Sequence, residues 1–358
     1  MPDGSPRSTA RRLWRALRLL VVCGSLLAAA PGGAQAPAEP LQLVATIPDL
    51  AAIAQAVGAP LLSVTVLSKG TEDPHFLEVK PSFVKALNEA DLFVHVGLDL
   101  EAGYLRPLLQ NARNPRILPG GAGYVDASRA VLPIEVQAGP TDRSMGDIHA
   151  YGNPHYWLDP LNGLRVGRLL RDALSALRPG DKTLFNARFD TFARQVAAAL
   201  VGSTLAAKYD VEKLCLLFEH GKLVSFLDTQ GEGRELSGWL GRLSPYVGTA
   251  VVDDHNMWPY FARRFGLRVV GHMEAKPGIP PTTSHLAVLV EEMRVAQVRL
   301  ILAAPYYDTR HARFLADATG ARVVPLTHMV GGRPGTEDYV RMIDYNVGQI
   351  VAALGGAG

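Results

Sequence analysis

The chain has 358 residues, 48% of them hydrophobic, which is long enough for roughly two domains with buried cores. Its 36 Lys and Arg residues nearly balance 34 Asp and Glu residues, leaving a formal net charge of +2. This balance, without a basic stripe interleaved with aromatic residues, argues against a nucleic-acid partner.

Residues 1–36 are typical of an export signal. Five arginines precede an apolar run from Leu19 to Ala30, which is too short to span a membrane. The sequence Ala34-Gln35-Ala36 then fits a small-x-small cleavage site. We therefore expect an exported protein whose mature chain begins at Pro37.

The cysteines bear on anchoring and on disulfides. Cys23 could mark a lipoprotein, but Val22 stands where lipid attachment requires a small residue, so lipid anchoring is not expected. Cleavage after Ala36 leaves Cys215 as the remaining cysteine, which excludes an intrachain disulfide.

The first third of the chain predicts an α/β fold with parallel strands. The expected elements are a strand at 41–46, a helix at 48–57, a strand at 61–67, a helix at 81–90 and a strand at 91–97. Strands that alternate with helices pair in parallel. The stretch from 107 to 146 is rich in Gly and Pro and predicts loops and short strands.

Two longer helices are expected next. Asp159-Pro160 is a helix start, with Asp as N-cap and Pro in the first turn, and that helix should reach Leu177. From 181 to 209, apolar residues recur at spacings of three and four and form a single stripe. This pattern predicts a long helix that joins the two halves.

The second half repeats the pattern of the first. We expect strands at 249–252, 268–273, 299–304 and 322–326, and helices at 258–265, 285–295 and 339–354. The predicted organisation is an N-terminal α/β lobe at 37–178, a connecting helix at 179–210 and a C-terminal α/β lobe at 211–358. Because ligands bind beyond the carboxyl ends of parallel strands, a site is expected in the cleft between the lobes.

Three histidines lie in loops that could line one cleft. His75 follows the strand at 61–67, His255 follows the strand at 249–252, and His155 precedes the helix that starts at Pro160. Neutral imidazoles are favoured ligands of zinc and similar divalent ions. From spacing alone, three unrelated loop histidines are the more ordinary interpretation.

Several ordered motifs decide between these interpretations. They are Asp73-Pro74-His75 followed by Pro81-Ser82, Gly146-Asp147-Ile148-His149 continuing through 152–160, His255 to Trp258, Glu274 to Pro281, and Asp338-Tyr339 with Tyr345-Asn346. With these motifs, the chain resembles the metal-binding solute-binding proteins of bacterial ABC importers for zinc and manganese, the cluster A-I family. The resemblance covers 41–354.

The resemblance implies a function and a site. It implies that His75, His155 and His255 are metal ligands and that the helix at 181–209 is a rigid connector. It also implies a periplasmic, non-enzymatic protein, expected to be a monomer, that delivers a divalent metal ion to an ABC importer permease in the inner membrane.

The fourth ligand is open at this stage. Family members often place an aspartate in the loop after the last strand, where this chain has His328. Asp308 also follows a strand, and a water molecule could fill the position as well. His149 could capture metal or pass it to the site, and Glu274 and Asp159 are expected to support the site or to cap a helix.

The ligand types favour Zn²⁺, because imidazole suits zinc whereas carboxylates suit Mn²⁺. The alternatives are a manganese-binding member of the same family and a secreted zinc hydrolase. A site of three histidines and a water would also suit a hydrolase, but no HExxH sequence is present. Nothing in the sequence calls for a third possibility, an adhesin.

Overall fold

The structure, a computed structural model, describes residues 1, 39–137, 139, 149–276 and 278–355. Cys23 and nearly all of the predicted export signal lie outside the described residues. In the part of the chain that is described, no helix has both the length and the apolar character needed to cross a membrane.

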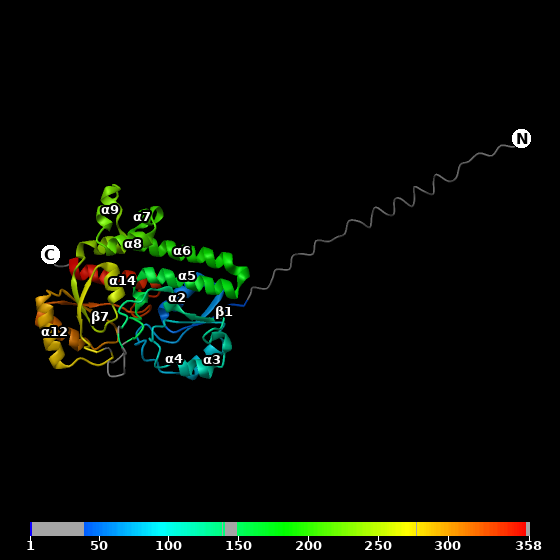
Figure 1. Cartoon of the computed structure of the whole chain (residues 1–358), viewed down its shortest axis with the longest axis horizontal. Coiled ribbons are helices and arrows are strands. Elements are labelled where there is room, and N and C mark those ends of the chain that lie inside the picture. The colour runs from blue at the N-terminus through cyan, green and yellow to red at the C-terminus, as the bar shows by residue number, and fades with distance from the viewer. Residues whose placement is uncertain (2–38, 138, 140–148, 277, 356–358) are drawn as a thin grey trace. The chain divides into compact units, whose positions relative to one another are not determined.

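Two four-stranded parallel sheets form the framework (Figure 1). The first has the order β2-β1-β3-β4, and its strands are β1 (Leu41–Ala45), β2 (Leu62–Val66), β3 (Leu92–His95) and β4 (Tyr124–Asp126). The second has the order β6-β5-β7-β8, with β5 (Ala250–Asp253), β6 (Arg268–His272), β7 (Leu300–Ala303) and β8 (Arg322–Pro325). The same topology occurs twice, which confirms the prediction of two similar α/β lobes.

Helices flank both sheets. Those of the first half are α2 (Pro48–Gly58), α3 (Pro81–Glu89), α4 (Leu105–Ala112) and α5 (Pro160–Leu177). The middle of the chain forms α6 (Lys182–Val201), α7 (Ser203–Lys208), α8 (Val211–Glu219), α9 (Leu223–Thr229) and α10 (Gly238–Leu243). The remaining helices are α11 (Pro259–Phe265), α12 (Thr283–Val295), α13 (Thr309–Thr319) and α14 (Tyr339–Gly355).

Helix α6 joins the two halves. It contacts α2 and α5 of the first half and α10 and α14 of the second, and Figure 1 shows α5 and α6 running side by side above the sheets. The apolar stripe predicted for this helix, from Phe185 to Leu200, is buried. One cluster of buried apolar side chains includes residues of both halves and of α6, so the halves share a core.

The predicted helix at 181–209 is wrong in one respect, because it is broken at Gly202. Gly202 has φ +93°, and a Cβ at this position would lie 2.0 Å from the Ser237 Oγ. The positive φ and the close approach both require glycine. The chain therefore ends α6 at Val201 and begins α7 at Ser203.

Candidate metal centre

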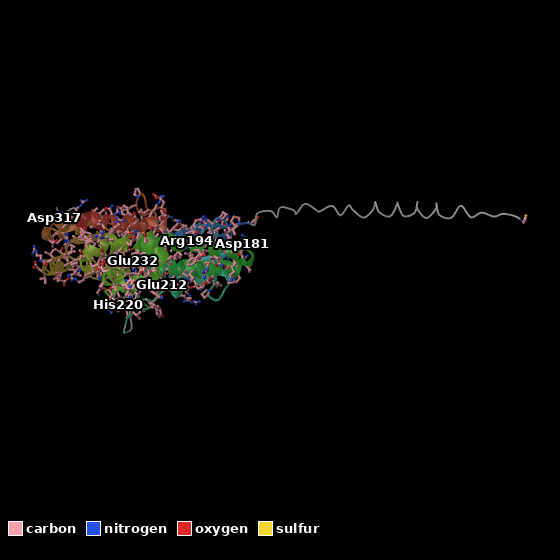
Figure 2. All side chains as sticks on the ribbon, turned by 90° about the horizontal axis from the view of Figure 1, so that it is seen from above. Asp181, Arg194, Glu212, His220, Glu232 and Asp317 are labelled. Carbon is pink, nitrogen blue, oxygen red and sulfur yellow. The ribbon has the colours of Figure 1, made fainter. Side chains whose placement is uncertain are left out.

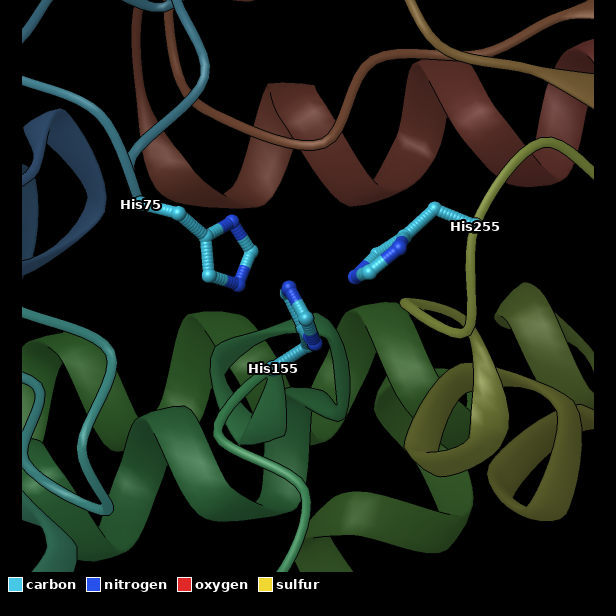
Figure 3. Close-up of side chains that lie close together, drawn as sticks. All are labelled: His75, His155 and His255. Carbon is cyan, nitrogen blue, oxygen red and sulfur yellow. The ribbon is translucent and has the colours of Figure 1, made fainter. Parts of the chain in front are cut away.

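Three histidines from separate parts of the chain meet in the interior. His75 lies in the loop after β2, His255 lies just after β5, and His155 precedes a 3-10 turn that leads into α5. Their exposed fractions are 7% for His75, 3% for His255 and 1% for His155. One potential ligand atom from each lies within 4.8 Å of the others, and Figure 3 shows the three rings pointing toward one another.

The rings form a nearly equilateral triangle. The ring centroids are 5.2 Å apart for His75 and His155, and 5.4 Å apart for the other two pairs. One pair of rings is tilted and the other two pairs are T-shaped. Buried imidazoles arranged in this way around a common point fit a bound divalent ion. The structure thus brings together the three histidines that the sequence suggested.

Each Nδ1 atom faces an oxygen acceptor. His75 Nδ1 lies 2.7 Å from Asp73 Oδ1, His155 Nδ1 lies 3.0 Å from Asn153 Oδ1, and His255 Nδ1 lies 3.0 Å from Glu274 Oε2. An Nδ1–H that donates to these oxygens leaves the lone pair of each ring on Nε2. This arrangement orients imidazoles in metal sites and increases their basicity.

Two of the acceptors belong to the same short motif. Asp73 Oδ1 also accepts the backbone N–H of His75 at 3.0 Å, and Asn153 Oδ1 accepts that of His155 at 3.0 Å. In both places an Asp or Asn side chain bonds the backbone two residues on, as in an Asx turn. The repeated sequence of Asp or Asn, Pro and His is the local signal for these hydrogen-bond partners, which were not predicted.

The His155 loop is fixed to the second half of the chain. Asn153 Nδ2 donates to the Asn256 carbonyl at 2.8 Å, and the Tyr260 hydroxyl donates to the Asn153 carbonyl at 3.0 Å. Asn256 is the neighbour of His255 in sequence. Two ligand candidates are therefore positioned relative to each other by direct hydrogen bonds.

The site is built to hold a neutral His155. Burial lowers the pKa of His155 well below its ordinary value, and the nearby His75 and His255 lower it further. Its Nε2 is buried and has no hydrogen-bond partner among the described residues. A buried lone pair without a partner is costly, and a divalent cation between the three histidines would satisfy it.

His328 lies outside the three-histidine group. It is fully buried, and its Nε2 lies 3.1 Å from the Glu72 carbonyl, to which it can donate. Its Nδ1 has no partner among the described residues, and its ring lies 4.8 Å from that of Tyr306. The nitrogen that could accept a metal is therefore Nδ1, in contrast to the three other histidines.

Asp308 is also outside the group, because it is the N-cap of α13. Its side chain accepts the backbone N–H of Arg310 at 2.9 Å and the Arg310 Nε–H at 2.7 Å. The neighbouring Arg310 lowers the pKa of Asp308 to about 2. Asp159 likewise caps α5, as predicted, and Glu274 supports His255.

His149 adjoins the group on the side of His75. Its Nε2 lies 3.2 Å from His75 Nε2, and the two rings are stacked with centroids 5.3 Å apart. Its ring centroid lies 6.4 Å from that of His155. Burial lowers the pKa of His149 to about 3, with further contributions from His75 and His255.

The buried His328 predicts a pH dependence of stability for the metal-free protein. Burial lowers its pKa from 6.5 to about 4, so the unfolded chain binds this proton more readily than the folded one. The resulting stabilisation is present above pH 6.5 and is lost as pH falls toward 4, by on the order of 3 kcal/mol. Urea unfolding between these values measures the loss.

His328→Gln is the matched variant, because the Gln amide nitrogen reaches about as far as the imidazole Nε2, can still donate to the Glu72 carbonyl and does not titrate. Its stability should fall less than that of the wild type over the same pH range. Parallel pH profiles for the two proteins would contradict the assignment.

A buried group of three histidines between two similar parallel α/β sheets defines a metal-binding protein. The family model of ZnuA, the periplasmic component A of a zinc-uptake complex, matches residues 43–203 and 240–353. The chain belongs to this family, whose members are non-enzymatic metal-binding components of ABC transporters. The family thus rules out the hydrolase considered above.

Similar proteins support both the family and the fold. The chain is 23% identical over 330 residues to the high-affinity zinc uptake protein ZnuA of Yersinia pestis, covering 87% of this chain and 91% of that protein. It is 22% identical over 349 residues to the manganese transporter lipoprotein PsaA of Streptococcus mitis, covering 96% of each. A crystal structure of ZnuA matches with a TM-score of 0.62 and 21% identity, covering 87% of this chain and 98% of that one.

Proposed function

We propose that this protein captures Zn²⁺ outside the cytoplasm and delivers it to an ABC importer permease in the inner membrane. The proposal includes export by residues 1–36, a periplasmic location without a lipid anchor, and action as a monomer. His75, His155 and His255 are the proposed ligands. The observation that carries the proposal is the set of three buried rings whose Nδ1 atoms face oxygen acceptors and whose Nε2 atoms are left for a metal.

The choice of zinc rests on the donor atoms. The three ligands are all imidazole nitrogens, which suit Zn²⁺, and the carboxylates of Asp73 and Glu274 bond to the rings instead of entering the group. Mn²⁺ is the second candidate, because the similar PsaA is a manganese transporter protein. An oxygen-rich ligand set would favour manganese, and Asp308, the carboxylate considered for this role, bonds to Arg310.

Titration of the metal-free protein tests this function. Isothermal titration calorimetry should show one tight site for Zn²⁺ and weaker binding of Mn²⁺. Because zinc binds the folded state, free zinc at 100 times Kd should stabilise it by about 2.7 kcal/mol and raise its Tm. Tighter binding of Mn²⁺ would overturn the choice of zinc, and a protein that binds neither ion would overturn the function.

A further inference from the structure

The contact between His149 and His75 has the geometry of two ligands on one ion. Asp73 fixes the Nδ1 side of His75, so its Nε2 is the atom available to a metal. His149 Nε2 lies 3.2 Å from this same atom. Two nitrogens bound at 2.0–2.1 Å to a tetrahedral zinc ion are about 3.3 Å apart. The observed spacing suits a hydrogen bond and also two neighbouring ligands of one ion. His149 lies outside the group of three whose ligand atoms are all within 4.8 Å of one another, so its ring has to shift to bind the same ion.

We propose that His149 supplies the fourth nitrogen ligand of the metal centre formed by His75, His155 and His255. This inference rests on the proposed function. Without metal, one of the two facing nitrogens must carry a hydrogen, and His149 Nε2–H can donate to the His75 lone pair. When an ion takes that lone pair, His149 moves its hydrogen to Nδ1 and turns its own Nε2 lone pair to the ion.

The other candidates fit the fourth position less well. The Asp308 carboxylate binds Arg310 while capping α13. His328 uses Nε2 for the Glu72 carbonyl, which leaves its buried Nδ1 for a metal, and its ring packs on that of Tyr306. His149 differs from both, because its Nε2 faces a ligand atom directly and its ring stacks on that of His75.

A fourth imidazole has a consequence for selectivity. The ion would have four neutral nitrogen ligands and no directly bound carboxylate. Such a set suits zinc and disfavours Mn²⁺, which prefers oxygen ligands and more than four of them. His149 would thus determine specificity, because its loss opens a position that water can fill.

The experiment counts ligands in the full-length mature protein. Zinc K-edge X-ray absorption of the wild type should show four imidazole nitrogens, and His149→Ala should show three nitrogens and one oxygen. Zinc affinity of His149→Ala, measured by competition with a chelator, should fall by at least about tenfold. Mutating a residue that only supports a ligand already costs about 10- to 100-fold in metal affinity, so the loss of a ligand should cost no less. The visible absorption bands of the cobalt-substituted protein should differ between the wild type and His149→Ala, because one ligand changes from nitrogen to oxygen.

His220→Ala is the matched control. This histidine lies at the exposed end of α8, and Figure 2 labels it at the edge of the molecule. Its removal should leave ligand number and affinity unchanged. His149→Gln tests the same position with a polar side chain larger than alanine. The number of ligands in the wild-type protein tests the proposal without any substitution.

The outcomes separate this inference from the proposed function. Three imidazoles in the wild type, or unchanged or tighter zinc binding by His149→Ala, would overturn the role of His149 and leave the function intact. Wild-type protein that binds no zinc would overturn both.

Discussion

The substitution His155→Ala should reduce zinc affinity by about 100- to 1,000-fold. Structural zinc sites have binding free energies of about 10–16 kcal/mol, so one of four ligands accounts for about 2.5–4 kcal/mol. His155 is the most buried of the three histidines, and its ring lies close to both others. Calorimetric titration of the metal-free variant with zinc measures the loss.

Two further variants show whether the loss of zinc affinity comes from the ligand itself. Asn153→Ala removes the oxygen that orients the ring but keeps the ligand, so it should cost about 10- to 100-fold. His220→Ala should bind zinc as the wild type does, because that histidine is exposed at the end of α8 and is not part of the three-histidine group. If His155→Ala retained wild-type affinity, the proposed ligand set would be refuted.

Much of the fold followed from local signals in the sequence. The strands are short runs of apolar residues, and α5 begins at the Asp159-Pro160 pair as predicted. The stretch from 107 to 146 contains the three-residue strand β4, which agrees with the prediction of loops and short strands there. Helix α4 was not predicted. It begins at Leu105, carries Pro107 in its first turn, where proline is tolerated, and is too short to show a clear periodicity.

The site shows the same limit. His75 and His255 follow strands of different sheets, and each was expected at the carboxyl edge of its own sheet, where ligands bind. Their closeness followed from the expectation that these two edges face one cleft. Asp308 was considered as a ligand because it follows a strand, but it caps α13, a helix that was not predicted. His149 was suggested only by its nearness to His155 in sequence. Its contact with His75, 74 residues away, is tertiary and has no local signal.

A buried ion pair holds the His155 segment to the second half of the chain. Arg264 of α11 donates to the Asp159 carboxylate through Nε at 2.8 Å and through its terminal nitrogen at 2.9 Å, and it lies 2.7 Å from Glu219 Oε1. Burial alone would lower the pKa of Arg264, but the charge and hydrogen bonds of Asp159 raise it. The Asp159 side chain also caps α5 by accepting the Leu161 N–H at 2.9 Å.

Arg264→Ala should therefore lower the free energy of unfolding by about 3–5 kcal/mol, because it leaves a buried carboxylate without its partner. The adjacent Arg263 is the control, since it also pairs with Glu219, at 2.9 Å, but its side chain is 57% exposed. Arg263→Ala should cost at most about 1 kcal/mol. Urea unfolding of both variants without metal makes the comparison. Equal losses would show that the pair between Arg264 and Asp159 does not stabilise the segment that leads from His155 into α5.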